Sequence, residues 1–306
     1  MSSYKIDVAI IGGTGFYSLD NFLELHEELD ILTPWGRPSS PIVICKTKTG
    51  KFVAFVNRHG PNHEFTPTGV PYQANIAALK HLGVKTVLAF SSVGSLRQEI
   101  APRDFVIPNQ VIDRTKGIRP SSYFQDGLVG HAGFGEPFDP TLNKLLTKLS
   151  KNLLKNEGHL IHSPESLKRD VTLICMEGPA FSTRAESNMY RMFGGDVINM
   201  SCLPEAKLAR EAEMSYQMIC MSTDYDSWRV DENTVTVEHI IANLHSNLES
   251  AKLFIAAVLD TVIAETESGR VGSAYYNTMQ HSITTKPNHR DEELEKNIQF
   301  LFPNYK

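Results

Sequence analysis

Residues 7–15, Asp-Val-Ala-Ile-Ile-Gly-Gly-Thr-Gly, decide how the rest of the chain is interpreted. The β-branched run 7–11 predicts a buried strand, and Gly12-Gly13 ends it in a tight turn. Glycine lets the backbone approach an anion, and the N–H groups of such a turn form an anion-binding nest. A phosphate site and a plain tight turn both explain the motif, and both stay open at this point.

A dinucleotide-binding fold is the obvious alternative for this turn. The glycines lack the G-x-G-x-x-G spacing, and residues 16–20 do not begin a well-patterned helix. A clear acidic residue at the end of a second strand, about 20 residues further on, is also missing. The motif therefore does not favour a nicotinamide cofactor, although an NAD-dependent reductase is kept as a competing class.

Strands and helices alternate along most of the chain. Further strands are predicted at 42–46, 52–56, 85–90, 105–112, 171–175, 196–199 and 216–222. Helices are predicted at 72–82, 141–155, 183–193, 204–213 and about 235–264. This alternation predicts an α/β fold with a mostly parallel sheet, in a single domain over residues 1–265. Residues 266–306 are polar and charged, and we expect a C-terminal appendage there, a loop followed by a short helix.

Composition narrows the class of protein. The chain has 306 residues, 41% hydrophobic and 21% charged, with a net charge of −5. A weakly acidic chain without a basic block does not indicate nucleic-acid binding, so small molecules are the expected partners. The four cysteines form no CxxC pair and are predicted to be buried free thiols. Without a signal-peptide pattern or a membrane-length apolar run, we expect a cytoplasmic protein, with the nucleus left open as a second location.

Polar side chains follow several of the predicted strands, at the end where open α/β sheets bind ligands. Arg58-His59 follows 52–56, Ser91-Ser92 follows 85–90, and Ser201 follows 196–199. The planar fork of an arginine suits phosphate, and a histidine adds another donor. No carboxylate that matches Arg58 stands beside it in the sequence. Taken together, these segments predict a phosphate pocket.

Two carboxylates, Asp224 and Asp226, follow the predicted strand 216–222. At positions i and i+2 they can face the same side of an extended segment. Mutual repulsion raises the pKa of one member of such a pair, which suits general acid–base catalysis. The alternative is an Asp-rich turn that caps the next element.

In their order along residues 8 to 250, these pieces resemble the 5′-methylthioadenosine phosphorylases of the purine nucleoside phosphorylase family. The resemblance is carried by Ile11-Gly12-Gly13-Thr14-Gly15, Arg58-His59-Gly60, Tyr72-Gln73-Ala74-Asn75, Gly94-Ser95-Leu96, Glu177-Gly178-Pro179, Phe181-Ser182-Thr183-Arg184-Ala185-Glu186, Val197-Ile198-Asn199-Met200 and Thr223-Asp224-Tyr225-Asp226.

The resemblance implies a single-domain α/β fold of the purine nucleoside phosphorylase type, usually assembled as a homotrimer. The implied reaction is the phosphorolysis of methylthioadenosine to adenine and 5-methylthioribose 1-phosphate. Inorganic phosphate would be a co-substrate, and neither a metal nor an organic cofactor is expected.

The resemblance also implies roles for individual residues. The phosphate-binding positions are matched by Thr14, Arg58, His59, Ser91, Ser92 and Ser201. The nucleoside-binding positions are matched by Phe181 against the purine, Met200 behind the ribose, and Asp224 and Asp226 at the base, with Asp224 as the catalytic acid. Ser182 and Val237 match positions that set specificity, and His131 matches a residue lent by the neighbouring subunit.

Three positions depart from the family pattern. Ser92 stands where alanine is often found, Ala180 replaces an arginine, and Pro71 replaces an asparagine. The C-terminal tail does not align well, so no residue of it is assigned to the 5′ pocket.

Three other functions compete with this one. Purine nucleoside phosphorylases that prefer inosine or guanosine carry Asn where this chain has Asp224 and Glu where it has Ser182, so both positions favour adenine here. An NAD-dependent reductase leaves Arg58-His59 and the two carboxylates unexplained. A non-catalytic nucleoside-binding protein on the same fold is the third alternative, and only a measurement of turnover can exclude it.

Overall fold

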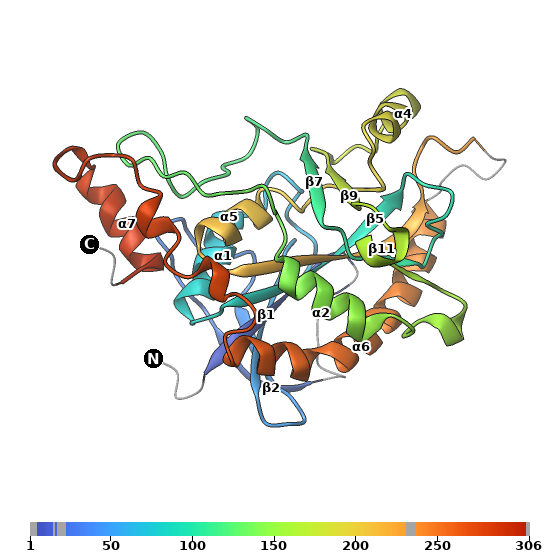
Figure 1. Cartoon of the computed structure of the whole chain (residues 1–306), viewed down its shortest axis with the longest axis horizontal. Helices are drawn as coiled ribbons and strands as arrows, with labels where there is room; N and C mark the ends of the chain where they lie inside the picture. Colours follow the sequence, from blue (N-terminus) through green and yellow to red (C-terminus); the bar gives the residue numbers. More distant parts are fainter. Residues whose placement is uncertain (1–4, 15, 17–22, 231–236, 304–306) are drawn as a thin grey trace.

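The computed structural model describes residues 5–14, 16, 23–230 and 237–303, and side chains for all of these except 237–242. A single large sheet runs through them, with helices on both of its faces (Figure 1). The predicted α/β fold with a mostly parallel sheet is confirmed. Within the described helices, none is long and apolar enough to cross a membrane.

Within the described residues, the sheet contains eleven strands. Their bounds are β1 (Ile6–Gly12), β2 (Glu24–Leu29), β3 (Ile42–Lys46), β4 (Phe52–Asn57), β5 (Thr86–Ser95), β6 (Phe105–Val106), β7 (Gln110–Asp113), β8 (Ile161–His162), β9 (Thr172–Cys175), β10 (Val197–Asn199) and β11 (Ser215–Tyr225). The order is β2-β3-β4-β1-β5-β10-β9-β7, with β11 paired to β5 and β6, and β8 paired to β6.

Strand β5 changes its neighbour partway along one of its edges. This point is called the division of β5 below. Along one edge it pairs in parallel with β11 over its whole length. Along the other edge it pairs with β1 as far as Ala89, and then with β10 from Gly94 onward. Residues 90–93 therefore lie between two different neighbours, beside the C-terminal end of β1. Such a change of strand neighbour opens a crevice where ligands bind in α/β sheets.

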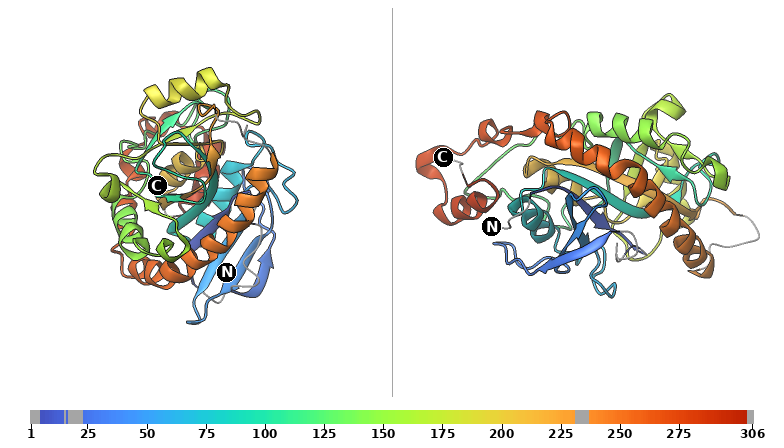
Figure 2. Two further views of the ribbon diagram at one scale, coloured as in Figure 1. Left: turned by 90° about the vertical axis from the view of Figure 1, so that its right-hand side faces the viewer. Right: turned by 90° about the horizontal axis from the view of Figure 1, so that it is seen from below.

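Helices cover the two faces of the sheet. Their bounds are α1 (Tyr72–His81), α2 (Pro140–Ser150), α3 (Pro164–Leu167), α4 (Arg184–Met192), α5 (Glu205–Glu211), α6 (Val237–Glu267) and α7 (Glu292–Leu301). The helices α1, α5 and α7 pack on one side, and α2 lies along α6 on the other (Figures 1 and 2). The short helix α4 projects from the body of the molecule.

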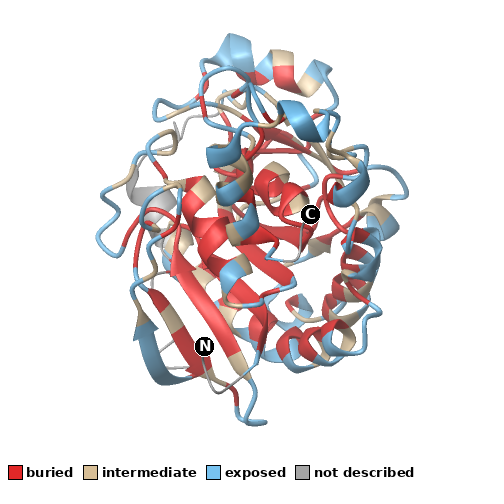
Figure 3. Ribbon diagram, turned by 90° about the vertical axis from the view of Figure 1, so that its left-hand side faces the viewer, coloured by how far each residue is buried: buried red, intermediate tan, exposed pale blue. Residues whose placement is uncertain are grey.

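The continuous apolar run of β1 is explained by these two layers. Successive side chains of a strand point to opposite faces. Accordingly, Ala9 and Ile11 join the core under α1 and α5, while Val8 and Ile10 join the core under α2 and α6. Figure 3 shows the central strands buried and the outer faces of the helices exposed.

Local sequence signals set where several helices begin. Thr183 and Glu186 form a capping box at the start of α4, in which each side chain accepts from the other residue's backbone N–H. Asp139 caps α2 in front of Pro140, accepting from two backbone N–H groups of the first turn.

Some elements differ from the sequence-based expectation. β2, with the sequence Glu-Leu-His-Glu-Glu-Leu, was not predicted, because its exposed edge position needs no apolar face. The predicted strand 105–112 is two short strands, β6 and β7. β5 and β11 both run past their predicted ends, so Ser91, Ser92 and Asp224 lie inside strands and not after them.

The C-terminal segment packs against the main body. Ile298, Leu301 and Phe302 are buried in the core on the α1 side, and the Phe300 ring stacks on His81 at 4.5 Å between centroids. The placement of the domain boundary at residue 265 stays a prediction, and α6 itself continues through Glu267.

Candidate active site

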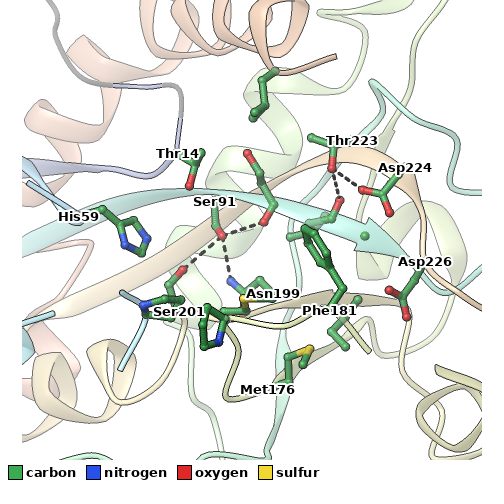
Figure 4. Close-up of a pocket in the computed structure, with 18 of the residues that line it drawn as sticks. Thr14, His59, Ser91, Met176, Phe181, Asn199, Ser201, Thr223, Asp224 and Asp226 are labelled. Carbon is green, nitrogen blue, oxygen red and sulfur yellow. Dashed lines mark hydrogen bonds between the residues drawn. The ribbon is translucent and has the colours of Figure 1, made fainter. Parts of the chain in front are cut away.

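A cavity of about 290 Å³ opens beside the division of β5 (Figure 4). It is lined by the loops after β1, β4 and β10, by the second half of β5 and by the end of β11. Most of the predicted site residues meet here from distant parts of the chain. The lining includes Thr14, Arg58, His59, Ser91, Ser92, Phe181, Met200, Ser201, Asp224 and Asp226.

Arg58 is fully buried and firmly held. Its Nε and Nη2 donate to the two carboxylate oxygens of Glu205 on α5, at 2.7 and 2.8 Å, and its Nη1 donates to the carbonyl of Phe90 at 2.8 Å. No matching carboxylate stands beside Arg58 in the sequence, and the fold brings Glu205 to it from 147 positions away.

This ion pair sets the charge at one end of the cavity. Burial alone would lower the pKa of Arg58, but the Glu205 carboxylate raises it overall, so the guanidinium stays charged. Glu205 also accepts from the Tyr216 hydroxyl at 2.7 Å. Of the five N–H groups of Arg58, three are used in bonds to described residues, which leaves two for an anion.

The glycine turn after β1 packs directly on this arginine. A Cβ on Gly13 would lie 2.5 Å from the Phe90 carbonyl oxygen and 3.0 Å from Arg58 Nη1. No residue with a side chain fits such a contact. The turn therefore serves close packing against Arg58 and β5, and it places Thr14 on the cavity wall.

His59 is a neutral side chain in this site. Its Nδ1 lies 2.9 Å from the carbonyl oxygen of Phe65, and a carbonyl only accepts, so Nδ1 carries the proton. Burial, followed by the charge of Arg58, lowers the pKa of His59 to about 4. The expectation that His59 adds a donor to the site is therefore wrong at neutral pH, because its remaining nitrogen, Nε2, is an acceptor.

Hydroxyl groups from β5 and from the loop after β10 meet where β5 changes its neighbour. Ser91 Oγ lies 3.3 Å from Ser201 Oγ and accepts from Asn199 Nδ2 at 3.0 Å (Figure 4). Ser92 Oγ is buried and has no hydrogen-bond partner among the described residues. Ser91 Oγ also donates to the Ser92 carbonyl at 3.1 Å. Because a hydroxyl can rotate, each of these groups can donate to a bound oxyanion.

The two carboxylates form the opposite end of the cavity. A bulge between Ser222 and Asp224 interrupts the pairing of β11 with β5. Gly94 lies between the carboxylates, since a Cβ there would be 3.4 Å from Asp224 Oδ2 and 3.3 Å from Asp226 Cβ. They share one region of the cavity wall, as the i and i+2 spacing predicts (Figure 4).

Both carboxylates hold their protons more tightly than ordinary aspartates. Burial raises the pKa of Asp224 to about 6, against the opposing hydrogen bond from Thr223 Oγ1 at 2.6 Å, and the charge of Asp226 adds to the rise. Burial likewise raises the pKa of Asp226, although Ser187 lowers it in part. Asp226 Oδ2 is buried, and no described residue reaches it with hydrogen-bond geometry. Burial, more than the mutual repulsion expected from the sequence, is the cause of the shifts.

Apolar side chains also line the cavity. Met176, Ile198 and Met200 line its wall, and Phe181 lies at the mouth with 64% of its surface exposed. Ser182 lies next to Phe181 but does not line the cavity, and its Oγ donates to Met176 Sδ at 3.3 Å. Its effect on specificity stays a prediction.

His131 does not line this cavity, and the position of the Val237 side chain cannot be compared with it. His131 lies on the exposed loop before α2, where its backbone N–H donates to the Ser282 carbonyl at 2.9 Å. Val237 begins α6, and its side chain lies outside the described residues.

Other lining residues had no assigned role in the sequence. They include His63, Asn199, Thr223 and Leu244. The ring of His63 stacks on that of His59 with centroids 4.7 Å apart. Asn199 and Thr223 stand inside segments that carry the resemblance, and that placement was the signal available for them. In the part of the chain that the structure describes, no group of His, Cys, Asp or Glu side chains could hold a metal ion.

Comparison with known proteins agrees with this site. The model of the phosphorylase superfamily matches residues 7–264. The S-methyl-5′-thioadenosine phosphorylase of Yarrowia lipolytica is 54% identical, covering 99% of this chain and 95% of its own length.

Solved structures give the same result. A methylthioadenosine phosphorylase from an antarctic soil metagenomic library superposes with a TM-score of 0.87 at 36% identity, covering 98% of this chain and 100% of its own. A methylthioadenosine phosphorylase from Schistosoma mansoni in complex with adenine gives a TM-score of 0.81 at 28% identity, covering 92% of this chain and 99% of its own. The resemblance inferred from the sequence is confirmed, and the chain belongs to the phosphorylase superfamily and, within it, to the S-methyl-5′-thioadenosine phosphorylases.

Proposed function

We propose that this protein catalyses the phosphorolysis of 5′-methylthioadenosine by inorganic phosphate, giving adenine and 5-methylthioribose 1-phosphate. The observation that carries the proposal is that one cavity holds an arginine with hydroxyl groups at one end and two carboxylates of raised pKa at the other. The relatives named S-methyl-5′-thioadenosine phosphorylase support it.

The phosphate end would hold and orient the nucleophile. Breaking an N-glycosidic bond builds positive charge on the sugar, which a nearby phosphate dianion stabilises and then captures. Arg58, Ser91 and Ser201 would donate to phosphate oxygens. His59 Nε2 would accept from the hydroxyl of hydrogen phosphate, because its Nδ1 proton is already used by Phe65.

The base end would make adenine a better leaving group. The departing base gains negative charge, and a proton delivered to N7 removes it. With a pKa of about 6, Asp224 keeps a protonated fraction near neutrality and would act as this acid. The unpartnered Asp226 Oδ2 would accept from the 6-amino group.

The remaining contacts would select the nucleoside. Phe181 would pack on the purine, whose binding covers this exposed ring, and Met200 would lie behind the ribose. Leu244, which lines the cavity, would favour an apolar methylthio group over a hydroxyl, and Val237 matches a position that sets this specificity in the family that the sequence resembles. Ser182 in place of Glu, and Asp224 in place of Asn, favour adenine over 6-oxopurines.

We also propose a homotrimer in which His131 completes the 5′ pocket of a neighbouring subunit. The support is that His131 is exposed and lies on a loop that does not line the cavity of its own chain. A fully active monomer in sedimentation would contradict this assembly.

No cofactor is part of the proposal, because exchanging a C–N bond for a C–O bond involves no net oxidation or reduction. We place the reaction in the cytoplasm, on the composition of the chain.

The test is adenine release from methylthioadenosine with and without phosphate. We expect release only with phosphate, together with formation of the sugar 1-phosphate. Equal turnover in phosphate-free buffer, giving free methylthioribose, would make the protein a hydrolase instead. Quenching or enhancement of NADH fluorescence on titration would point to the reductase alternative.

A further inference from the structure

A second buried arginine, Arg119, lies on the long loop between β7 and α2 and is 4% exposed. Its donors go to backbone carbonyls: Nη1 to Met200 at 2.7 Å and Leu203 at 2.6 Å, and Nη2 to Glu177 at 2.7 Å. Its Nε donates more weakly to Thr68 Oγ1, at 3.3 Å.

Arg119 differs from Arg58 in its charge balance. Arg58 is paired with Glu205, whereas no carboxylate among the described residues forms an ion pair with Arg119. A buried charge without a counter-ion is costly, so it is retained where an anion or oriented dipoles compensate it. Here three carbonyl dipoles do so in part, and the net positive charge persists.

The carbonyls that Arg119 holds belong to the two loops that form one wall of the cavity. Glu177 directly precedes the segment with Pro179 and Phe181, which lines the base side. Met200 and Ser201 line the ribose and phosphate side. One guanidinium therefore ties together the loops that would contact the two substrates.

The Met200–Ser201 peptide links Arg119 to the part of the cavity where an anion would bind. In a trans peptide the C=O and N–H point in opposite directions. Because the Met200 carbonyl points to Arg119, the Ser201 N–H points away from it, and no acceptor for that N–H is present in the described part of the chain. Ser201 is 3% exposed and lines the cavity. A buried N–H without an acceptor indicates that a ligand supplies one.

We propose that Arg119 is a positioning residue for phosphate: it fixes the Met200–Ser201 peptide so that the Ser201 N–H meets a phosphate oxygen, and it supplies the net positive charge that the Arg58–Glu205 pair does not. The proposal rests on phosphorolysis as the reaction. Polarisation by the guanidinium strengthens the opposite N–H as a donor. The charge of Arg119 also contributes to the lowered pKa of His59, which indicates that its field reaches the phosphate end.

The experiment compares Arg119→Met and Arg119→Lys with the wild-type protein, measuring kcat and the KM values for phosphate and for methylthioadenosine. We expect Arg119→Met to raise the phosphate KM about tenfold or more, while the nucleoside KM changes less than about threefold. Lysine keeps the charge but cannot span three carbonyls, so the phosphate KM of Arg119→Lys should rise only about threefold.

The control is Arg169→Met, which removes an arginine paired with Asp196 outside the cavity and should leave both KM values unchanged. An unchanged phosphate KM in folded Arg119→Met overturns the proposal, and so does an equal rise of both KM values that lysine does not relieve. If Arg119→Met does not fold, Arg119→Lys decides, and an unchanged phosphate KM in it overturns the proposal. Wild-type adenine release without phosphate would instead overturn the proposed function.

Discussion

The phosphate end and the base end of the cavity differ in how far their ionisable side chains are paired within the protein. At the phosphate end, Arg58 is matched by Glu205 and His59 by the Phe65 carbonyl, at distances between 2.7 and 2.9 Å. At the base end, Asp226 Oδ2 has no partner among the described residues, and both carboxylates have raised pKa values.

Because of this difference, we expect the phosphate end to contribute to the stability of the fold and the base end to contribute mainly to catalysis. Groups that are matched inside the protein stabilise the fold before a ligand arrives, whereas an unmatched buried group costs stability until a ligand completes it. Substitutions at the phosphate end should therefore act on folding as well as on binding. Substitutions at the base end should act on turnover while leaving the fold intact.

The largest effect is expected for Asp224→Asn. An amide cannot protonate N7, so kcat/KM for methylthioadenosine should fall about 10²–10⁴-fold. Activity on inosine relative to methylthioadenosine should rise, because an amide accepts a 6-oxo neighbour that two carboxylates repel. The measurement is kcat/KM for both nucleosides together with a melting curve.

A capping role for Asp224 predicts a different pattern. Loss of a cap would lower stability by about 1 kcal/mol and leave the kinetics per folded molecule unchanged. Full methylthioadenosine activity in Asp224→Asn would therefore end its assignment as the acid.

Glu205→Gln should lower the stability of the folded protein, because it removes the partner of Arg58 at the phosphate end. Removing one partner of a buried ion pair costs about 3–5 kcal/mol of folding free energy, because the other charge is left unpaired. Urea denaturation measures this loss. Added phosphate should then stabilise the variant more than the wild type, because the anion becomes the partner of Arg58.

The matched control removes a carboxylate from an exposed pair. Lys151 and Glu165 lie 3.1 Å apart at the surface, and Glu165→Gln should cost less than about 1 kcal/mol. Equal losses of folding free energy in Glu165→Gln and Glu205→Gln would show that the buried ion pair contributes no more to stability than the exposed one.

Asp226→Asn should have a smaller effect. One amide orientation still offers an oxygen to the 6-amino group, so we expect the nucleoside KM to rise about tenfold with kcat less affected. Because burial raises the pKa of Asp226, its ionised form is disfavoured in the folded protein above the unfolded pKa. The neutral amide removes that cost, so the melting temperature at pH 7 should not fall. A marked fall would mean that Asp226 is a structural group.

The sequence predicted the features that depend on residues close to one another along the chain. The run 7–15 predicted a strand that ends in a tight turn, and the spacing of Asp224 and Asp226 predicted that they share a wall of the cavity. Most of the site residues predicted from ordered motifs along the chain line the cavity.

Such patterns could not predict contacts that depend on how distant parts of the chain are arranged in space. The pairing of Arg58 with Glu205 leaves no local signal, since 147 positions separate them. The division of β5 between β1 and β10 depends on strand register, and the tautomer of His59 depends on a carbonyl six residues away. These three features determine how charge is distributed in the site.

The central claim, that Asp224 acts as an acid at the base end, is tested most directly by the pH dependence of kcat/KM for methylthioadenosine at saturating phosphate. The active form is the protonated one, and the pKa of Asp224 is raised to about 6, so activity should be highest below that pH and fall up to about tenfold per pH unit above it. Asp224→Asn should lose this decline. A wild-type profile that stays flat through pH 6, or an unchanged decline in Asp224→Asn, would contradict the account.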